Sequence, residues 1–173
     1  MATPTNTSVE GVSQEVYFNN SNQVRGYGDV LELTPVMDTS AYTANDVWFD
    51  TTAIASALPT SGGACEITSI MILDEDDQTA AAVTLYFFRS NVSLGTFNGA
   101  PNISDANARE LQGTVAFAAG DFVDVGGAKV GTVRNVGLIY ESTGTSMFVA
   151  GTCAGTPTQT ASGIKIRIGV KYL

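Results

Sequence analysis

The chain has 173 residues, enough for one domain with a sizeable core and at most an added arm. Charged residues make up only 14% and the formal net charge is -9, so the molecule as a whole repels phosphate and anionic lipid, which argues against nucleic-acid and membrane partners. Histidine is absent, which removes the commonest general base, a frequent zinc ligand and the middle of any Ser/His/Asp relay. We therefore expect no enzyme, and so few charges favour burial of surface in an assembly.

The first residues, Met1 to Gly11, are rich in Thr, Asn, Pro and Ser, which predicts a flexible arm. A strand-like run, Glu15 to Phe18, follows. We assign residues 1–22 to this N-terminal arm and first strand, and residues 23–173 to a β-sandwich domain. Met1 to Ser8 lacks the basic start and apolar core of a signal peptide, and no apolar run approaches the ~20 residues that cross a bilayer. We therefore expect that the protein is made and used without secretion through a signal peptide.

Short runs of residues that suit a pleated, half-buried surface recur along the rest of the chain, separated by Gly, Asn, Asp and Thr turns. Their spacing is typical of a sandwich or jelly roll, so we predict an all-β, antiparallel β-sandwich of jelly-roll type. The expected strands are Arg25 to Leu33, Val47 to Asp50, Cys65 to Leu73, Ala82 to Arg89, Thr114 to Phe117, Phe122 to Val125, Lys129 to Tyr140, Ser146 to Cys153 and Gly163 to Leu173.

One segment departs from this strand pattern. Ser104 is a good N-cap, and the following residues, Asp105 to Leu111, begin with an acid and continue with good helix formers. The sequence therefore predicts one short helix of about two turns there.

Two longer connections, Thr51 to Gly63 and Ser90 to Asn102, carry little regular signal. The second contains Leu94 and Phe97 among Asn and Gly residues. Large apolar side chains would be wasteful on a solvated loop, so these two either plug the core or contact a partner, and the sequence does not choose between the two roles.

The two cysteines, Cys65 and Cys153, both lie in strand-like surroundings. Two cysteines are too few for a disulfide-stapled fold of this length, although they could still pair with each other. We favour buried free thiols over a bridge.

The acidic run Asp74 to Asp77 is the best candidate for a metal site, because calcium requires several oxygens around one point. The run lacks the central glycine and the closing glutamate of an EF-hand loop. We interpret it as a solvated hairpin turn whose like charges discourage edge pairing, and we expect neither a metal nor a cofactor. The chain has 17 Asp and Glu residues, so a glycosidase-type pair of catalytic carboxylates is a further alternative. Only the distance between two such carboxylates in space decides this case.

The C-terminal segment is the clearest amphipathic strand. Alternate residues from Ile164 to Tyr172 are apolar and fall on one face, while Lys165, Arg167 and Lys171 fall on the other. Such a basic stripe either pairs with acidic neighbours across strands or protects an edge, or it docks on an acidic patch of a partner. We favour the first interpretation and keep these three residues as possible partner contacts.

The segment Leu33 to Val47, with its Pro35, Asp38-Thr39-Ser40-Ala41-Tyr42 and Asp46-Val47, resembles a group of tailed-phage virion proteins. Asn45 stands where many relatives have glycine before the Asp-Val pair, and asparagine tolerates positive φ, so the turn can survive. Three further blocks follow in the order of that group: Ile67 to Asp74, Leu85 to Phe88, and Ser104 to Asn107 leading to Gly113 to Phe117.

This group is the tailed-phage head decoration, or cement, protein family. The resemblance implies a small β-sandwich on the outer capsid surface of a virion, made in the host cytoplasm, with the major capsid protein as partner and with homo-oligomers. A carbohydrate- or receptor-binding β-sandwich module of a phage tail or fibre is the alternative. The motif residues, to which the resemblance gives a structural role, are Asp38, Thr39, Tyr42, Asp46, Asp105 and Asn107.

Overall fold

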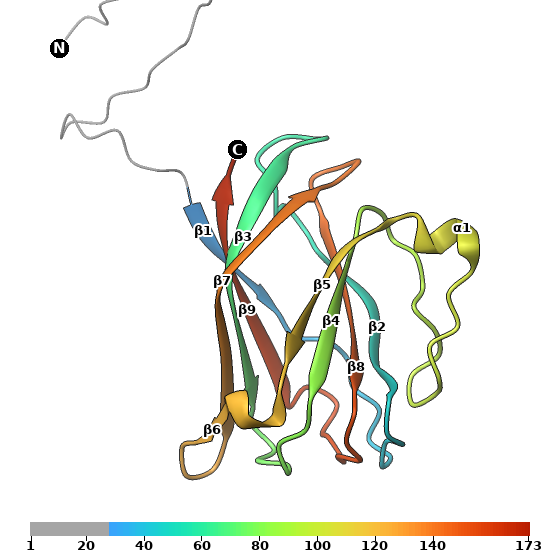
Figure 1. Ribbon diagram of the computed structural model, residues 1–173, viewed down its shortest axis with the longest axis vertical. Helices are drawn as coiled ribbons and strands as arrows, with labels where there is room; N and C mark the ends of the chain where they lie inside the picture. Colours follow the sequence, from blue (N-terminus) through green and yellow to red (C-terminus); the bar gives the residue numbers. More distant parts are fainter. Residues whose placement is uncertain (1–27) are drawn as a thin grey trace, which may run out of the picture.

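The computed structural model describes residues 28–173. The predicted arm, the strand Glu15 to Phe18 and the domain boundary at residue 22 lie outside the described residues. Two antiparallel sheets pack face to face (Figure 1), as the all-β prediction required. The five-stranded sheet contains, in spatial order, β1 (Gly28–Leu33), β9 (Ile164–Tyr172), β3 (Ala64–Asp74), β7 (Lys129–Glu141) and β6 (Phe122–Asp124). The four-stranded sheet contains β2 (Asp46–Ile54), β8 (Met147–Cys153), β4 (Val83–Phe88) and β5 (Leu111–Phe117).

The strand pairing is that of a jelly roll. Strand β1 pairs with β9, β2 with β8, β3 with β7 and β4 with β5, all antiparallel. These are the pairs of one long hairpin with its tip at β4 and β5, wound so that successive pairs alternate between the two sheets. The predicted jelly-roll architecture is therefore confirmed.

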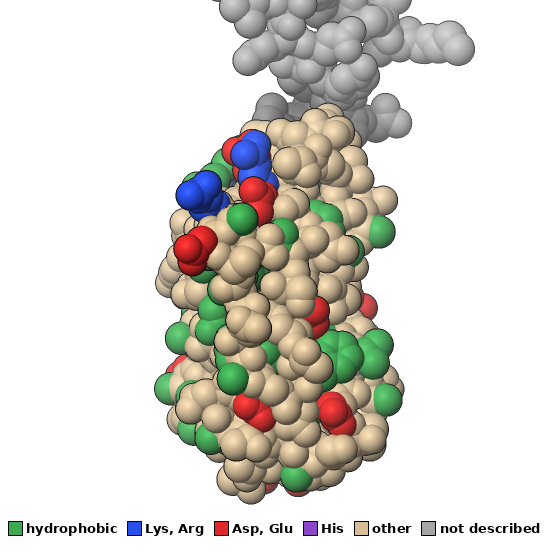
Figure 2. Space-filling view, turned by 90° about the vertical axis from the view of Figure 1, so that its right-hand side faces the viewer, with side chains coloured by type: hydrophobic (Ala, Val, Ile, Leu, Met, Phe, Trp, Pro, Cys, Tyr) green, Lys and Arg blue, Asp and Glu red, His purple; other side chains and the backbone are tan. Residues whose placement is uncertain are grey.

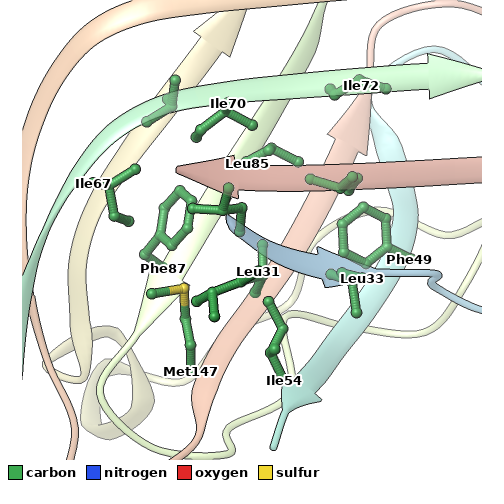
Figure 3. Close-up of a cluster of buried hydrophobic side chains, with 14 of the residues drawn as sticks. Leu31, Leu33, Phe49, Ile54, Ile67, Ile70, Ile72, Leu85, Phe87 and Met147 are labelled. Carbon is green, nitrogen blue, oxygen red and sulfur yellow. The ribbon is translucent and has the colours of Figure 1, made fainter. Parts of the chain in front are cut away.

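The hydrophobic core lies between the sheets, and strands such as β9 alternate buried and outward-facing residues with period two. In β9 the residues Ile164, Ile166 and Ile168 are fully buried, while the lysine and arginine between them face outward. Figure 3 shows the core, in which Ile67, Ile70 and other side chains of the five-stranded sheet face Leu85, Phe87, Met147 and others of the four-stranded sheet.

Two polar side chains tie the two sheets together. The buried Tyr140 of β7 donates a hydrogen bond from its hydroxyl to the Phe88 carbonyl of β4 (2.8 Å) and accepts one from the Phe148 N–H of β8 (3.0 Å). On the β5 side of the sandwich, the Gln112 amide donates to the Glu141 carbonyl and accepts from the Glu141 N–H (2.8 Å). Each of these side chains thus bonds to backbone groups of the opposite sheet.

Strand β2 is longer than the sequence predicted, because it continues to Ile54 instead of ending at Asp50. The extension pairs Thr52, Ala53 and Ile54 with β8. Register shifts interrupt this pairing, which explains why the polar stretch after Asp50 lacks the alternation on which the prediction relied.

The single predicted helix is present but shorter than expected. Helix α1 covers only Asp105–Ala108, and its N-cap Ser104 accepts the Asn107 N–H through Oγ (3.2 Å) as the sequence indicated. Leu111 pairs with Phe88 and opens β5, so strand pairing overrides helix propensity. A single 3-10 turn, Ala119–Asp121, precedes β6, and no helix among the described residues has the length and hydrophobicity to cross a bilayer.

A second apolar cluster lies on the outer face of the four-stranded sheet. We name residues 89–104 the covering segment, since they run from β4 to α1 over this face (Figure 1). Val47, Phe88 and Ala150 of the sheet are buried beneath Leu94 of the covering segment. The segment is fixed to β2 because its Gly99 carbonyl and Asn98 N–H pair with the Val47 backbone (2.8 and 3.0 Å).

Candidate functional site

The connection between β1 and β2 contains the motif residues that carry the resemblance. Asp38 Oδ1 accepts the Ser40 N–H (2.7 Å), which closes a local turn. Tyr42 is 2% exposed, and its hydroxyl accepts the Asp38 N–H (2.7 Å) and donates to the Trp48 carbonyl (2.8 Å). Asp38 and Tyr42 thus hold the connection against β2, a structural role as expected.

The end of the same connection is closed by Asp46, whose Oδ2 accepts the Thr43 N–H (3.1 Å). Asn45 has a φ of 72°, so it occupies the left-handed conformation that its tolerance of positive φ allows. Thr39 lies exposed at the surface of the first turn. The motif therefore builds a turn, and Thr39, Ser40 and Ala41 are exposed at its surface.

The acidic run is not a hairpin turn. It follows β3 in one sheet and leads to β4 in the other, so the connection crosses between sheets. Asp74 is buried, and its carboxylate accepts the N–H groups of Asp76 (3.0 Å) and Gln78 (3.2 Å). Asp76 in turn accepts the Thr160 N–H (2.7 Å). These two acids bind the crossover to the segment before β9, and the prediction of a purely solvated run is wrong for them.

Asp74 also lines a small, partly open pocket with Trp48 and Gln159, of about 20 Å³. This volume suits a single water molecule and excludes a sugar ring. The Gln159 amide lies between two carboxylates, and its NH2 donates to Asp74 Oδ1 (3.3 Å) and Asp76 Oδ2 (2.8 Å). Burial raises the pKa of Asp74, and the hydrogen bonds from Asp76 and Gln159 offset part of that rise. Within residues 28–173 no three carboxylate or thiol side chains converge as metal ligands.

Removal of divalent cations is expected to leave the melting temperature unchanged. The Asp74 and Asp76 carboxylates already accept hydrogen bonds from backbone N–H groups and from Gln159, so they hold the crossover without a cation. Thermal unfolding with and without excess EDTA measures this. A clear fall in melting temperature that added calcium reverses would contradict it.

The structure gives different roles to Leu94 and Phe97, the two apolar residues of the covering segment that the sequence could not assign. Leu94 is 2% exposed within the second cluster, so it plugs that cluster and is not available to a partner. Asp50 of β2 fixes it from below, since the carboxylate accepts the Leu94 N–H (2.7 Å) and the Ser93 hydroxyl (2.7 Å). Phe97 is 40% exposed and remains a candidate contact. Figure 2 shows this side of the molecule, where hydrophobic side chains are dispersed among polar ones.

The basic stripe of β9 lies on the outer face of the five-stranded sheet. Arg167 Nε donates to Glu32 Oε1 of β1 (2.7 Å), and Lys165 Nζ lies 3.9 Å from Glu75 Oε2. For these two residues the interpretation as pairing with acidic neighbours is confirmed. Lys171 is exposed, and within the described residues its side chain makes neither an ion pair nor a hydrogen bond.

The structure adds residues to this face that the sequence analysis did not select. Arg134 of β7 is exposed opposite Ser69 of β3, and the described residues provide no partner for its guanidinium. The outward-facing Val30 of β1 and Ile139 of β7 are 60% and 54% exposed. The alternation of β7 could have indicated Arg134 and Ile139, but only strand order places them on the same face as the β9 stripe.

The two cysteines are free and buried, on strands of opposite sheets. Burial raises the pKa of Cys65 to about 11 and also raises the pKa of Cys153, so both thiols stay protonated at neutral pH. The prediction of buried free thiols is confirmed.

No protein-family model and no curated protein sequence matches this chain. A solved structure of a marine algae virus of the order Picornavirales aligns over 97% of this chain and 84% of that chain. The sequence identity is 8% and the TM-score is 0.29, a likeness too remote to carry an argument about function. The architecture given above follows from the strand pairing alone.

Proposed function

We propose that this chain is a decoration, or cement, protein that binds the outside of a tailed-phage head. The observation that carries the proposal is the jelly-roll strand order, an architecture used by viral capsid domains. It occurs in a chain whose stretch from Asp38 to Asp46 resembles phage virion proteins. Because lectin domains use the same architecture, the strand order alone does not exclude a carbohydrate-binding role, and the surface and the experiments below address that alternative.

The proposed mechanism is mechanical. A protein that bridges neighbouring subunits of the major capsid protein contributes binding free energy only to the assembled shell. Separating subunits under the pressure of packaged DNA then costs more. Self-association of the decoration protein on the shell would multiply the contacts, and a net charge of -9 suits the outer surface better than one facing DNA.

We favour binding over catalysis, because several of the polar side chains that could act as acids or bases are engaged in the fold. Asp74 and Asp76 hold the crossover, and the cavity beside Asp74 has room for one water molecule. The Tyr42 and Tyr140 hydroxyls both bond to backbone groups.

The carbohydrate-binding alternative requires an exposed aromatic platform. Trp48, the single tryptophan of the chain, is 3% exposed and cannot present its ring to a sugar. Binding to a glycan array would favour this alternative over the decoration role.

Sedimentation of the purified chain with cognate heads tests the proposal. We expect the chain to pellet with intact heads in a saturable manner and to remain in solution without them. A chain that never sediments with any cognate head would contradict the decoration role.

A further inference from the structure

The two ends of β3 are tied to the opposite sheet in different ways. At its start, Cys65 pairs with Tyr140, whose hydroxyl bonds directly to the four-stranded sheet. At its end, Asp74 lines the small pocket described above, together with Trp48 of β2 and Cys153 of β8 from the four-stranded sheet. We call this space the Asp74 pocket. The polar groups around it determine what it can bind.

A register shift in β2 places Trp48 in the core beside this pocket. Strict alternation along a strand would put Trp48 and Phe49 on opposite faces. The pairing with β8 shifts between Val47 and Phe49, so Trp48 and Phe49 both belong to the main core, while Val47 belongs to the second cluster. The Trp48 ring lies 6.0 Å from the Phe49 ring, centroid to centroid, and the residue is 3% exposed.

The indole N–H of Trp48 is a buried donor that lacks an acceptor. Within residues 28–173 its Nε1 atom has no hydrogen-bond partner. Nearly all buried N–H groups in folded proteins bond to the protein or to an ordered water, because a buried donor without a partner is costly. The Trp48 side chain lines the Asp74 pocket, so a molecule bound there can supply the acceptor.

Asp74 brings the complementary group, a carboxylate with one acceptor position to spare. Its side chain continues the buried row of β3 that includes Ile72, so it points into the sandwich. Within the described residues, Oδ1 accepts from the Asp76 N–H (3.0 Å) and the Gln159 amide (3.3 Å), whereas Oδ2 accepts only from the Gln78 N–H (3.2 Å). Since each carboxylate oxygen can accept about two hydrogen bonds, Oδ2 has room for one further donor.

The charges around the pocket disfavour an ion as the occupant. A cation would meet the Lys129 side chain, which also lines the pocket, and an anion would meet the Asp74 carboxylate. The occupant should therefore be neutral, accept a hydrogen bond from Trp48 and donate one to Asp74. A water molecule does both, and the volume of about 20 Å³ has space for one.

We propose that the Asp74 pocket holds one ordered water molecule, which accepts a hydrogen bond from Trp48 Nε1 and donates one to Asp74 Oδ2. This water connects β2 of the four-stranded sheet with β3 of the five-stranded sheet, as the Tyr140 hydroxyl connects the sheets at the other end of β3. It is a part of the fold whether or not the chain binds a phage head.

NMR spectroscopy of the isotope-labelled, full-length chain tests this directly. Trp48 is the single tryptophan, so the spectrum contains a single indole N–H signal. We expect a nuclear Overhauser effect between this indole proton and water, with the sign that a bound water gives and freely diffusing water does not. A folded wild-type chain whose indole proton shows no such effect would overturn the proposal.

Asp74→Asn tests the other partner of the water. The substitution replaces one acceptor oxygen by an NH2 donor, so the hydrogen bonds of the water change and the indole signal should shift. The matched control is Glu75→Gln, which removes the same charge from the adjacent residue, whose side chain is exposed and does not line the pocket. It should leave the indole signal and the contact with water as in the wild-type chain. An unshifted indole signal in folded Asp74→Asn would show that Asp74 does not hold the water.

Thermal unfolding gives an independent test that does not require Asp74→Asn to fold. Biosynthetic replacement of Trp48 by benzothienylalanine puts sulfur in place of the N–H in a ring of similar shape. Removing a donor that is bonded to water lowers stability, whereas removing a buried donor without a partner raises it. We therefore expect a lower melting temperature, and a higher one would contradict the water bridge.

Discussion

Replacement of Tyr140 by phenylalanine is expected to lower the free energy of unfolding by about 2–4 kcal/mol. The hydroxyl donates to the Phe88 carbonyl (2.8 Å) and accepts from the Phe148 N–H (3.0 Å), and both groups lie on the opposite sheet. Without it two backbone groups around a fully buried side chain lose a partner, and each such loss costs about 1–3 kcal/mol. Urea unfolding of the two proteins measures the difference.

Tyr86→Phe is the matched control for this substitution. The Tyr86 hydroxyl is half-buried and makes a single long contact to Thr152 Oγ1 (3.5 Å), so its removal should cost less than about 1 kcal/mol. Equal losses for the two variants would show that Tyr140 does not connect the sheets as described.

The same tyrosine predicts how stability depends on alkaline pH. Burial raises the pKa of Tyr140 from 10.0 to about 12, so the folded state favours the protonated phenol. This contribution is fully present below pH 10 and is lost as the pH rises from 10 to about 12, by up to about 3 kcal/mol. Tyr42 has the same raised pKa and acts in the same direction. The free energy of unfolding of Tyr140→Phe should therefore fall less steeply with rising pH than that of the wild-type chain over this range.

Replacement of Leu94 by alanine is expected to lower the free energy of unfolding by about 2–4 kcal/mol. The side chain is the part of the covering segment that fills the second cluster, against Val47 and Phe88. Its removal leaves a cavity that the segment cannot close fully, since Asp50 and the Val47 backbone hold the segment in place.

Phe97→Ala in the same segment is the control. Phe97 is 40% exposed and lies outside both clusters, so the loss should stay below about 1 kcal/mol. Denaturant unfolding of the two variants side by side gives the comparison. A larger loss for Phe97 than for Leu94 would mean that the covering segment packs differently from the description above.

The fold followed from the sequence where a strand has one buried and one solvated face. Ile164, Ile166 and Ile168 set the register of β9, since a shift by one residue would expose all three. The sequence does not reveal where a second layer buries both faces of a strand. Phe88 of β4 faces outward beneath the covering segment, and no pattern within the strand indicates this.

The connections were harder to predict than the strands. Asp74 to Asp77 resembled a hairpin turn because the strands on both sides are close in sequence, yet those strands belong to different sheets. The local sequence pattern of a connection contains no information on which sheet the next strand joins. Asp38, Tyr42 and Asp46 were selected through the family resemblance, and in the structure they hold the connection before β2 through local hydrogen bonds.

The cations on the outer face of the five-stranded sheet could be predicted only in part. The β9 stripe of Lys165, Arg167 and Lys171 was visible in the sequence, and its pairing with acidic neighbours is confirmed for the first two. Arg134 comes from a strand that is distant in the chain and adjacent to β3 in space. A surface assembled from four strands depends on their order, which periodicity does not reveal.

Electron microscopy of cognate phage heads, with and without the purified chain, tests the decoration role most directly. We expect jelly-roll density at fixed positions on the outer surface, each copy in contact with more than one shell subunit, and a higher temperature of head disassembly when the chain is bound. Density inside the shell or on the tail, or heads whose disassembly temperature is unchanged at saturation, would contradict it.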